Sequence, residues 1–310
     1  MSKRASPPLL PGSRRLGVPA SLCLATILWL CGCATTATET SRAEPQGEVA
    51  ARADRYELLR EAADHEALFT LAGGLKPMST GIWHGSFAVD APDLTELRAV
   101  RAALDPLRNE TWYADVQVFA DVHEGERSAH AFVVHRRALS RMIERFASFW
   151  SPWGITPCTH PSEVVAVVDR MPRADRWRGY GYLFGFPADA VDFFVETGMA
   201  DEDPSEIGPG KDRQFVQIPT FAADSGRFTY AAPLASERTA ADDALARTAK
   251  EILEAYAERR GRMRDVDTLL HELRRLDRRF EHAAILAARE RDRGATAPDP
   301  VDPAPAPALR

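Results

Sequence analysis

One face of a predicted β-hairpin collects a histidine and two aspartates. The runs 111–122 and 127–135 alternate apolar and polar residues about a tight turn at Glu124–Gly125, so we predict two paired antiparallel strands. In a regular register one face is apolar core, and the other face holds Tyr113, Asp115, Gln117, Asp121, Ser128 and His130. A histidine beside carboxylates can bind a metal ion or act as acid and base.

The regular register places His130 diagonal to Asp121 on the neighbouring strand. Asp115, Asp121 and His130 are therefore candidate catalytic residues of a hydrolase, with or without a metal ion. His84 lies on a strand predicted at 81–89 and would join them if that strand neighbours the hairpin. The alternative is that this face is polar because it contacts solvent.

A glycine-rich loop at 73–81 contains a second candidate site. Its glycines, Lys76 and the hydroxyl of Ser79 are the components of an anion cradle, and they are candidate substrate-binding residues. The alternative is an ordinary connection from a helix to a strand, in which the glycines end the helix.

A third candidate site lies at 177–185, where aromatic residues alternate with glycines. We predict a strand, with Tyr180 and Tyr182 on one face. An aromatic face beside small residues can stack against a sugar, which would suit a glycan-binding module. The alternative is a core strand with a helix packed tightly on its glycines.

The elements that position these residues mix helices and strands without a regular βαβ rhythm. We predict helices at 50–71, 92–108, 137–150, 162–171 and after Pro187, and a second hairpin with strands 214–221 and 227–231. This order is typical of an α+β domain with a mainly antiparallel sheet, extending over residues 50–235.

Residues 236–293 contain no proline and carry apolar residues at heptad spacing. Because the heptad phase continues through Gly261, we predict one long helix, straight or hinged at that glycine. Such an arm would bind a protein partner or a second copy of the chain through 241–287. The alternative is that its first half packs on the α+β domain. Residues 294–310 alternate proline and alanine, and we predict a disordered tail.

The first residues have the layout of an export signal. The leader contains four basic residues, Lys3, Arg4, Arg14 and Arg15. An apolar run at 16–30 follows and is too short to span a membrane easily. The sequence Leu30-Cys31-Gly32-Cys33 then resembles the lipobox of bacterial lipoprotein precursors. This resemblance implies that residues 1–32 are removed and that Cys33 carries the lipid that attaches the protein to a membrane.

The small polar residues 33–49 suit a tether between the lipid and the folded domain. Sorting rules of the lipoprotein family depend on the residue after the lipidated cysteine. Ala34 at that position implies an outer-membrane protein that faces the periplasm rather than one retained at the inner membrane.

Charge and missing motifs narrow the possible functions. The chain has a formal charge of −6, and loss of the basic leader makes it more acidic, which argues against a nucleic-acid partner. The sequence has no Gly-x-Ser-x-Gly, His-Glu-x-x-His, Cys-x-x-Cys or dinucleotide motif. We therefore expect a lipid-anchored protein- or envelope-binding module, with a hydrolase and a glycan-binding module as alternatives.

Overall fold

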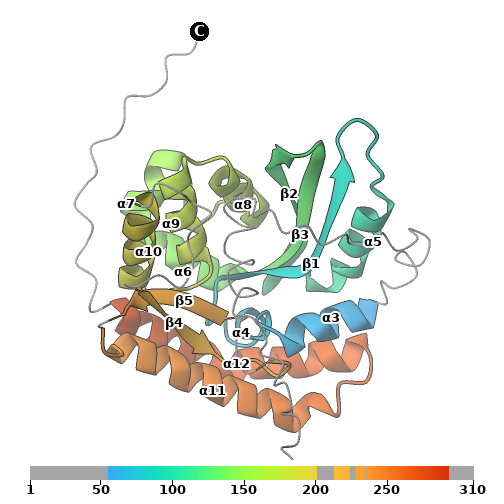
Figure 1. The fold of residues 1–310 in the computed structure, drawn as a ribbon. Coiled ribbons are helices and arrows are strands. Elements are labelled where there is room, and N and C mark those ends of the chain that lie inside the picture. Colours follow the sequence, from blue (N-terminus) through green and yellow to red (C-terminus); the bar gives the residue numbers. More distant parts are fainter. Residues whose placement is uncertain (1–54, 201–212, 224–227, 235, 293–310) are drawn as a thin grey trace, which may run out of the picture.

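The computed structural model describes residues 55–200, 213–223, 228–234 and 236–292. Within them, antiparallel sheets pack against helices, which confirms the predicted α+β class (Figure 1). The strands are β1 (Met78–Ala88), β2 (Trp112–His123), β3 (Glu126–His135), β4 (Arg213–Ile218) and β5 (Phe228–Pro233). The α-helices are α3 (Arg55–Asp64), α4 (Leu68–Leu71), α5 (Thr95–Ala103), α6 (Arg136–Arg145), α7 (Ala147–Trp150), α8 (Pro161–Asp169), α9 (Arg173–Leu183), α10 (Ala188–Ala200), α11 (Ala240–Arg260) and α12 (Val266–Asp292). Short 3-10 turns are η2 (Asp105–Leu107) and η3 (Ser151–Trp153).

The larger sheet has the strand order β1-β3-β2, and both ladders are antiparallel. The predicted hairpin is confirmed, including the pairing of His123 with Glu126 at its turn. The register shifts between Val118 and Val122, however, so β2 contains a bulge. Every pair beyond the bulge is therefore displaced from the regular register that the sequence had predicted.

Both faces of this sheet are covered, each by its own apolar core. The predicted core face, with Trp112 and Val133, packs on α3, α4, α11 and α12. The opposite face, with Phe132 and Val134, packs on α6, α8 and α9. The expectation of a solvated second face is therefore wrong for the half of the sheet that contains His130, because helices that follow the hairpin in sequence fold back over it (Figure 1).

The second hairpin is also confirmed, with β4 and β5 paired from Arg213 opposite Pro233 to Ile218 opposite Phe228. Its predicted turn, at 224–226, lies outside the described residues. The Phe228 ring packs against Phe69 of α4, with ring centroids 5.4 Å apart. This contact joins the small sheet to the core beneath the larger one.

The predicted strand at 177–185 is wrong, since residues 177–183 belong to helix α9 and Phe184 is its C-cap. Glycines that looked like the small positions of a strand instead allow close helix packing. A Cβ atom on Gly179 would lie 3.2 Å from Val168, and one on Gly181 would lie 2.6 Å from Val191. The tyrosines between them are consequently on a helix, where Tyr180 stacks on Phe184 one turn later.

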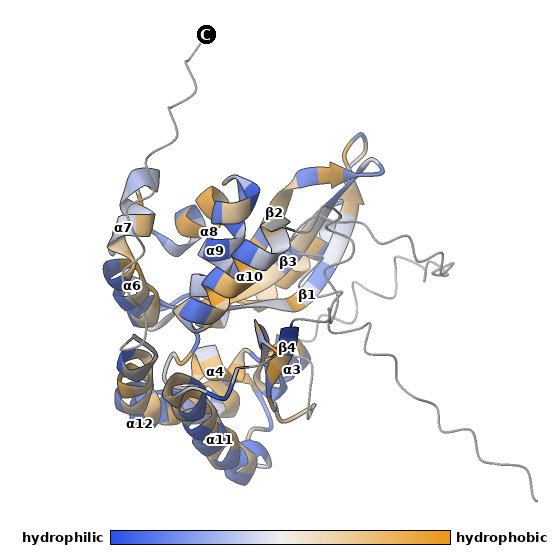
Figure 2. Cartoon of the chain, turned by 60° about the vertical axis from the view of Figure 1, so that its left-hand side comes forward, coloured by the Kyte–Doolittle hydropathy of each residue, from blue (hydrophilic) through white to orange (hydrophobic). Residues whose placement is uncertain are grey.

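The C-terminal segment is helical as predicted, but it forms two helices instead of one. Helix α11 ends at Arg260, with Gly261 as its C-cap. The Asp265 carboxylate then accepts a hydrogen bond from the Thr268 N–H at 2.8 Å, which starts α12. The two helices lie side by side beneath α3 and α4 (Figures 1 and 2). The apolar stripe of the predicted arm is buried in the shared core, at Leu269, Leu273, Leu276 and Phe280. Self-association would therefore need a different surface from this stripe.

The predicted signal peptide, Cys33, the tether and the tail after residue 293 lie outside the described residues. Among the residues that are described, no helix has both the length and the apolar character needed to cross a membrane.

Candidate functional site

The bulge in β2 separates the two side chains that a regular register had brought together. A regular register continued from the His123–Glu126 pair would set His130 opposite Phe119, but in the structure His130 faces Gln117, two residues away. Asp121 lies in the irregular stretch, is 68% exposed, and its carboxylate pairs with Arg176 Nη1 at 3.2 Å. The predicted pairing of His130 with Asp121 is therefore wrong.

Two side chains, Arg127 and Asp169, hold the bulge in place through hydrogen bonds. The Arg127 guanidinium donates hydrogen bonds to the carbonyl oxygens of Phe119 and Ala120. The Ala120 N–H donates in turn to the Asp169 carboxylate at 2.8 Å. Burial is the main cause of a raised pKa for Asp169, which the Ala120 hydrogen bond partly offsets. The alternation of residues in β2 gives no sign of these contacts, because Asp169 comes from α8.

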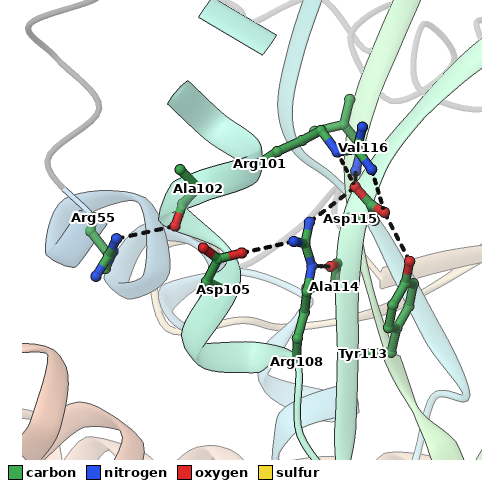
Figure 3. A network of polar contacts seen from close by, with 9 residues as sticks. All are labelled: Arg55, Arg101, Ala102, Asp105, Arg108, Tyr113, Ala114, Asp115 and Val116. Carbon is green, nitrogen blue, oxygen red and sulfur yellow. Dashed lines mark hydrogen bonds and ion pairs between the residues drawn. The ribbon is translucent and has the colours of Figure 1, made fainter. Parts of the chain in front are cut away.

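Asp115 is a structural carboxylate at the edge of the sheet (Figure 3). It pairs with Arg101 at 2.7 Å and with Arg108 at 3.1 Å, and it accepts a hydrogen bond from the Tyr113 hydroxyl at 2.8 Å. Burial alone would raise the pKa of Asp115, but the Val116 N–H, Tyr113 and Arg101 together hold the pKa below its ordinary value. This carboxylate stays ionised and is already saturated with donors, which is unsuitable for general acid–base catalysis.

His84 does reach His130, because β1 pairs with β3 and sets the two histidines opposite each other. Their ring centroids are 5.5 Å apart, and the Phe119 ring lies 4.8 Å from that of His130. Burial and the neighbouring His84 lower the pKa of His130 to about 4. Among the described residues, no group of three or more histidine, cysteine, aspartate or glutamate side chains is arranged to hold a metal ion. The structure therefore brings the histidines together and leaves Asp115 and Asp121 elsewhere.

The Lys76 side chain points into the protein rather than toward solvent, where a ligand could reach it. Its side chain is 1% exposed and pairs with Glu66 at 2.6 Å. The ammonium also lies over the Phe228 ring, 4.6 Å from its centroid. Ser79 is buried beside this pair and shares a hydrogen bond with Thr70 at 2.8 Å. Lys76 and Ser79, the candidate substrate-binding residues of the loop, therefore make internal contacts with Glu66 and Thr70 that stabilise the fold.

The two candidate glycan-binding tyrosines are buried. The Tyr180 hydroxyl accepts a hydrogen bond from the Gln117 amide at 2.7 Å. Tyr182 stacks on Phe146, with ring centroids 3.8 Å apart and ring planes within 8° of parallel. The exposed aromatic groove that a glycan site needs is absent at these two positions.

A cleft opens where α6, the end of α9, α12 and the loop before β1 meet. It has a volume of about 200 Å³. Its lining is apolar except for three arginines and consists of Gly74, Pro77, Ala138, Arg141, Met142, Arg145, Phe146, Tyr182, Gly185, Phe186, Ala284, Ile285, Ala288 and Arg289. Of the candidate residues named from the sequence, Tyr182 lines this cleft, and the glycine-rich loop contributes Gly74 and Pro77. The cleft lining does not include Lys76, Ser79 or Tyr180.

A buried polar network joins three of the elements that build the cleft, namely α6, α12 and the loop before β1. The Ala138 N–H donates to His135 Nδ1 at 3.1 Å and begins α6, which leaves Nε2 to donate to the Asp277 carboxylate at 3.0 Å. The same carboxylate oxygen accepts from the Gly73 N–H at 3.0 Å. Asp277 of α12 therefore holds both α6 and the loop in position.

The glycine pair in this loop is required by packing. Gly73 and Gly74 have φ angles of +91° and +64°, which glycine adopts without strain. A Cβ atom at Gly73 would lie 2.8 Å from the Phe280 backbone, and one at Gly74 would lie 2.8 Å from the His135 ring. The glycines bring the loop against α12 and α6, so their role is close approach instead of an anion cradle.

The electrostatics of the cleft favour an anion. Among the described residues that line it, three are arginines and none is acidic. Glu281, just outside the lining, pairs with Arg137 at 3.2 Å and lies 3.6 Å from Arg141. Burial lowers the pKa of the Arg141 guanidinium, and Glu281 offsets only part of that effect. The cleft therefore combines apolar walls with three guanidinium groups, and the Glu281 carboxylate lies at its edge beside Arg141.

Sequence reasoning missed these arginines. Arg141 and Arg145 lie one turn apart on α6, so their shared face was a readable signal. Arg289 follows almost 150 residues later, and no local pattern places α12 beside α6. Comparisons with known protein families, curated proteins and solved structures give no match, so the assignment of this site rests on its geometry.

Proposed function

We propose that the protein is an exported binding protein, attached by a lipid on Cys33 to the outer membrane, that takes up an anionic ligand with an apolar body in the cleft between α6, α9 and α12. The anchor rests on the lipobox-like sequence around Cys33. This small-molecule role replaces the protein- or envelope-binding role expected from the sequence, because the C-terminal stripe that was to carry that role is buried in the core.

The observation that carries the binding proposal is the lining itself. Arg141, Arg145 and Arg289 line an otherwise mainly apolar cleft in a chain of formal charge −6. Guanidinium groups recognise carboxylate and phosphate groups through paired hydrogen bonds. Apolar walls beside such groups are typical of small-molecule sites, in which a few polar groups fix the orientation of the ligand.

The size of the cleft limits the ligand. A dry protein cavity of about 150 Å³ accepts benzene. The volume of about 200 Å³ therefore suits a single aromatic ring or a short acyl chain. A larger ligand would place only one end in the cleft.

Thermal unfolding tests the binding role. The whole mature chain, residues 33–310, carries Cys33→Ser so that no lipid is attached. We expect benzoate, benzenesulfonate or phenyl phosphate to raise the Tm, and the neutral benzyl alcohol to have a much smaller effect, because ligands stabilise the state that binds them. The double variant Arg145→Met/Arg289→Met should lose the response, and Arg262→Met, outside the cleft, should keep it. Equal responses in the two variants would refute the assignment.

Mass spectrometry tests the anchor separately. We expect the natural protein to begin at Cys33 with covalently attached acyl chains, and the Cys33→Ser precursor to remain uncleaved and without lipid. A mature protein that begins elsewhere and lacks lipid would contradict this part of the proposal.

A further inference from the structure

A carboxylate of the protein already contacts the arginines at the edge of the cleft. Arg137 Nη1 donates hydrogen bonds to both Glu281 oxygens at 3.2 Å. Arg141 Nη1 lies 3.6 Å from Glu281 Oε1, which is an electrostatic contact longer than a hydrogen bond. Glu281 therefore binds Arg137 more closely than it binds Arg141.

The two arginines differ in what they can offer a ligand. Arg137 is 71% exposed and does not line the cleft, whereas the half-buried Arg141 does. Glu281 lies one turn before Ile285, a lining residue of the same helix. A ligand carboxylate that binds Arg141 would bring the same charge and the same pair of oxygens as Glu281, and Glu281 would keep its hydrogen bonds to Arg137.

We propose that the ligand is a monocarboxylate with an apolar body of about six to eight carbon atoms, and that Glu281 is an internal competitor for Arg141. This inference rests on the proposed function of the cleft. Glu281 sets the affinity without lining the cleft, since it partly neutralises the guanidinium that the ligand needs. Arg137 raises the affinity for the ligand, because its hydrogen bonds to Glu281 keep that carboxylate from binding Arg141 more closely.

Two variants outside the lining test the competition. In the whole mature chain with Cys33→Ser, calorimetric titration with benzoate should show Glu281→Gln binding roughly two- to five-fold more tightly than the parent, the scale of a partly exposed ion pair. Arg137→Gln should bind benzoate weaker by a similar factor. Arg262→Gln, on the turn between α11 and α12, is the control and should not change the affinity. The parent should bind benzoate more tightly than phenyl phosphate.

The outcomes separate this inference from the proposed function. If benzoate binds but Glu281→Gln and Arg137→Gln leave its affinity unchanged, or if phenyl phosphate binds more tightly, the competition and the carboxylate assignment are overturned while the anion-binding function stands. If neither probe binds the parent, the proposed function fails and this inference fails with it.

Discussion

Glu66→Gln is expected to destabilise the protein more than Lys76→Met, although each variant breaks the same ion pair. The two partners differ in their access to water, since the Lys76 side chain is 1% exposed and that of Glu66 is 18% exposed. Loss of Glu66 leaves an ammonium inside the protein, where only the Phe184 and Phe228 rings lie near it among the described contacts. Loss of Lys76 leaves a carboxylate that water can still reach.

The expected magnitudes follow from this asymmetry. Removing one partner of a buried ion pair costs about 3–5 kcal/mol, which we assign to Glu66→Gln. Lys76→Met keeps the length of the side chain and loses the ion pair and the cation–π contacts, for about 1–3 kcal/mol. In a domain of this size, 1 kcal/mol corresponds to roughly 2–4 °C in Tm, so Glu66→Gln should lower the Tm by about 6–20 °C.

The free energy of unfolding in urea, measured for both single variants and the double variant, tests this reasoning. We expect the double variant to resemble Lys76→Met, because Glu66 matters only while the ammonium is present. A Glu66→Gln variant as stable as Lys76→Met, or a double variant with the summed loss, would refute it.

The pH dependence of stability gives a second test of the same pair. Burial lowers the pKa of Lys76, and Glu66 raises it again in part. The unfolded chain therefore binds more protons than the folded one below the usual lysine pKa, and stability rises with pH in that range. Because Glu66→Gln removes the contribution that raises the pKa, raising the pH from about 7 to about 9 should recover part of its lost stability.

Three further predictions concern the sheet and the elements that build the cleft. Because the pKa of His130 is lowered to about 4 in the folded protein, the free energy of unfolding should fall by up to about 3 kcal/mol as the pH drops from 6.5 to 4. In the His130→Phe variant, the urea midpoint should not show this pH dependence. Asp277→Ala should cost about 3–5 kcal/mol by urea unfolding, because the His135 Nε2 and the Gly73 N–H both lose their buried acceptor, whereas Asp267→Ala at the exposed start of α12 should cost less than about 1 kcal/mol. Gly73→Ala should lower the Tm at a cost of about 2 kcal/mol or more, since its φ of +91° and the 2.8 Å contact exclude a Cβ atom.

Local patterns predicted the fold class and both hairpins because alternation and turn residues act between near neighbours in sequence. The His123–Glu126 turn pair came from such a pattern and is confirmed. The bulge was missed because its causes, Arg127 and Asp169, act across strands and from α8. A register shift of two residues at this point was enough to place Asp121 wrongly.

Long-range packing decided the features that the sequence left open. Glycine and tyrosine alternate at 177–185 as they do in a strand, but residues 177–183 are helical. The glycines there let the side chains of Val168 and Val191 pack close to the helix. A continuous heptad phase at 236–293 could not distinguish one helix from two that pack on a common core. The cleft depends on that second arrangement, because α12 reaches α6 only after the turn at Gly261.

A crystal structure of the mature chain with saturating benzoate tests the central claim most directly. We predict benzoate in the cleft, with its carboxylate on Arg141 and its ring against the apolar lining, and Glu281 still hydrogen-bonded to Arg137. An empty cleft in crystals whose α6, α9 and α12 match the present structure, or benzoate bound only elsewhere, would contradict the account.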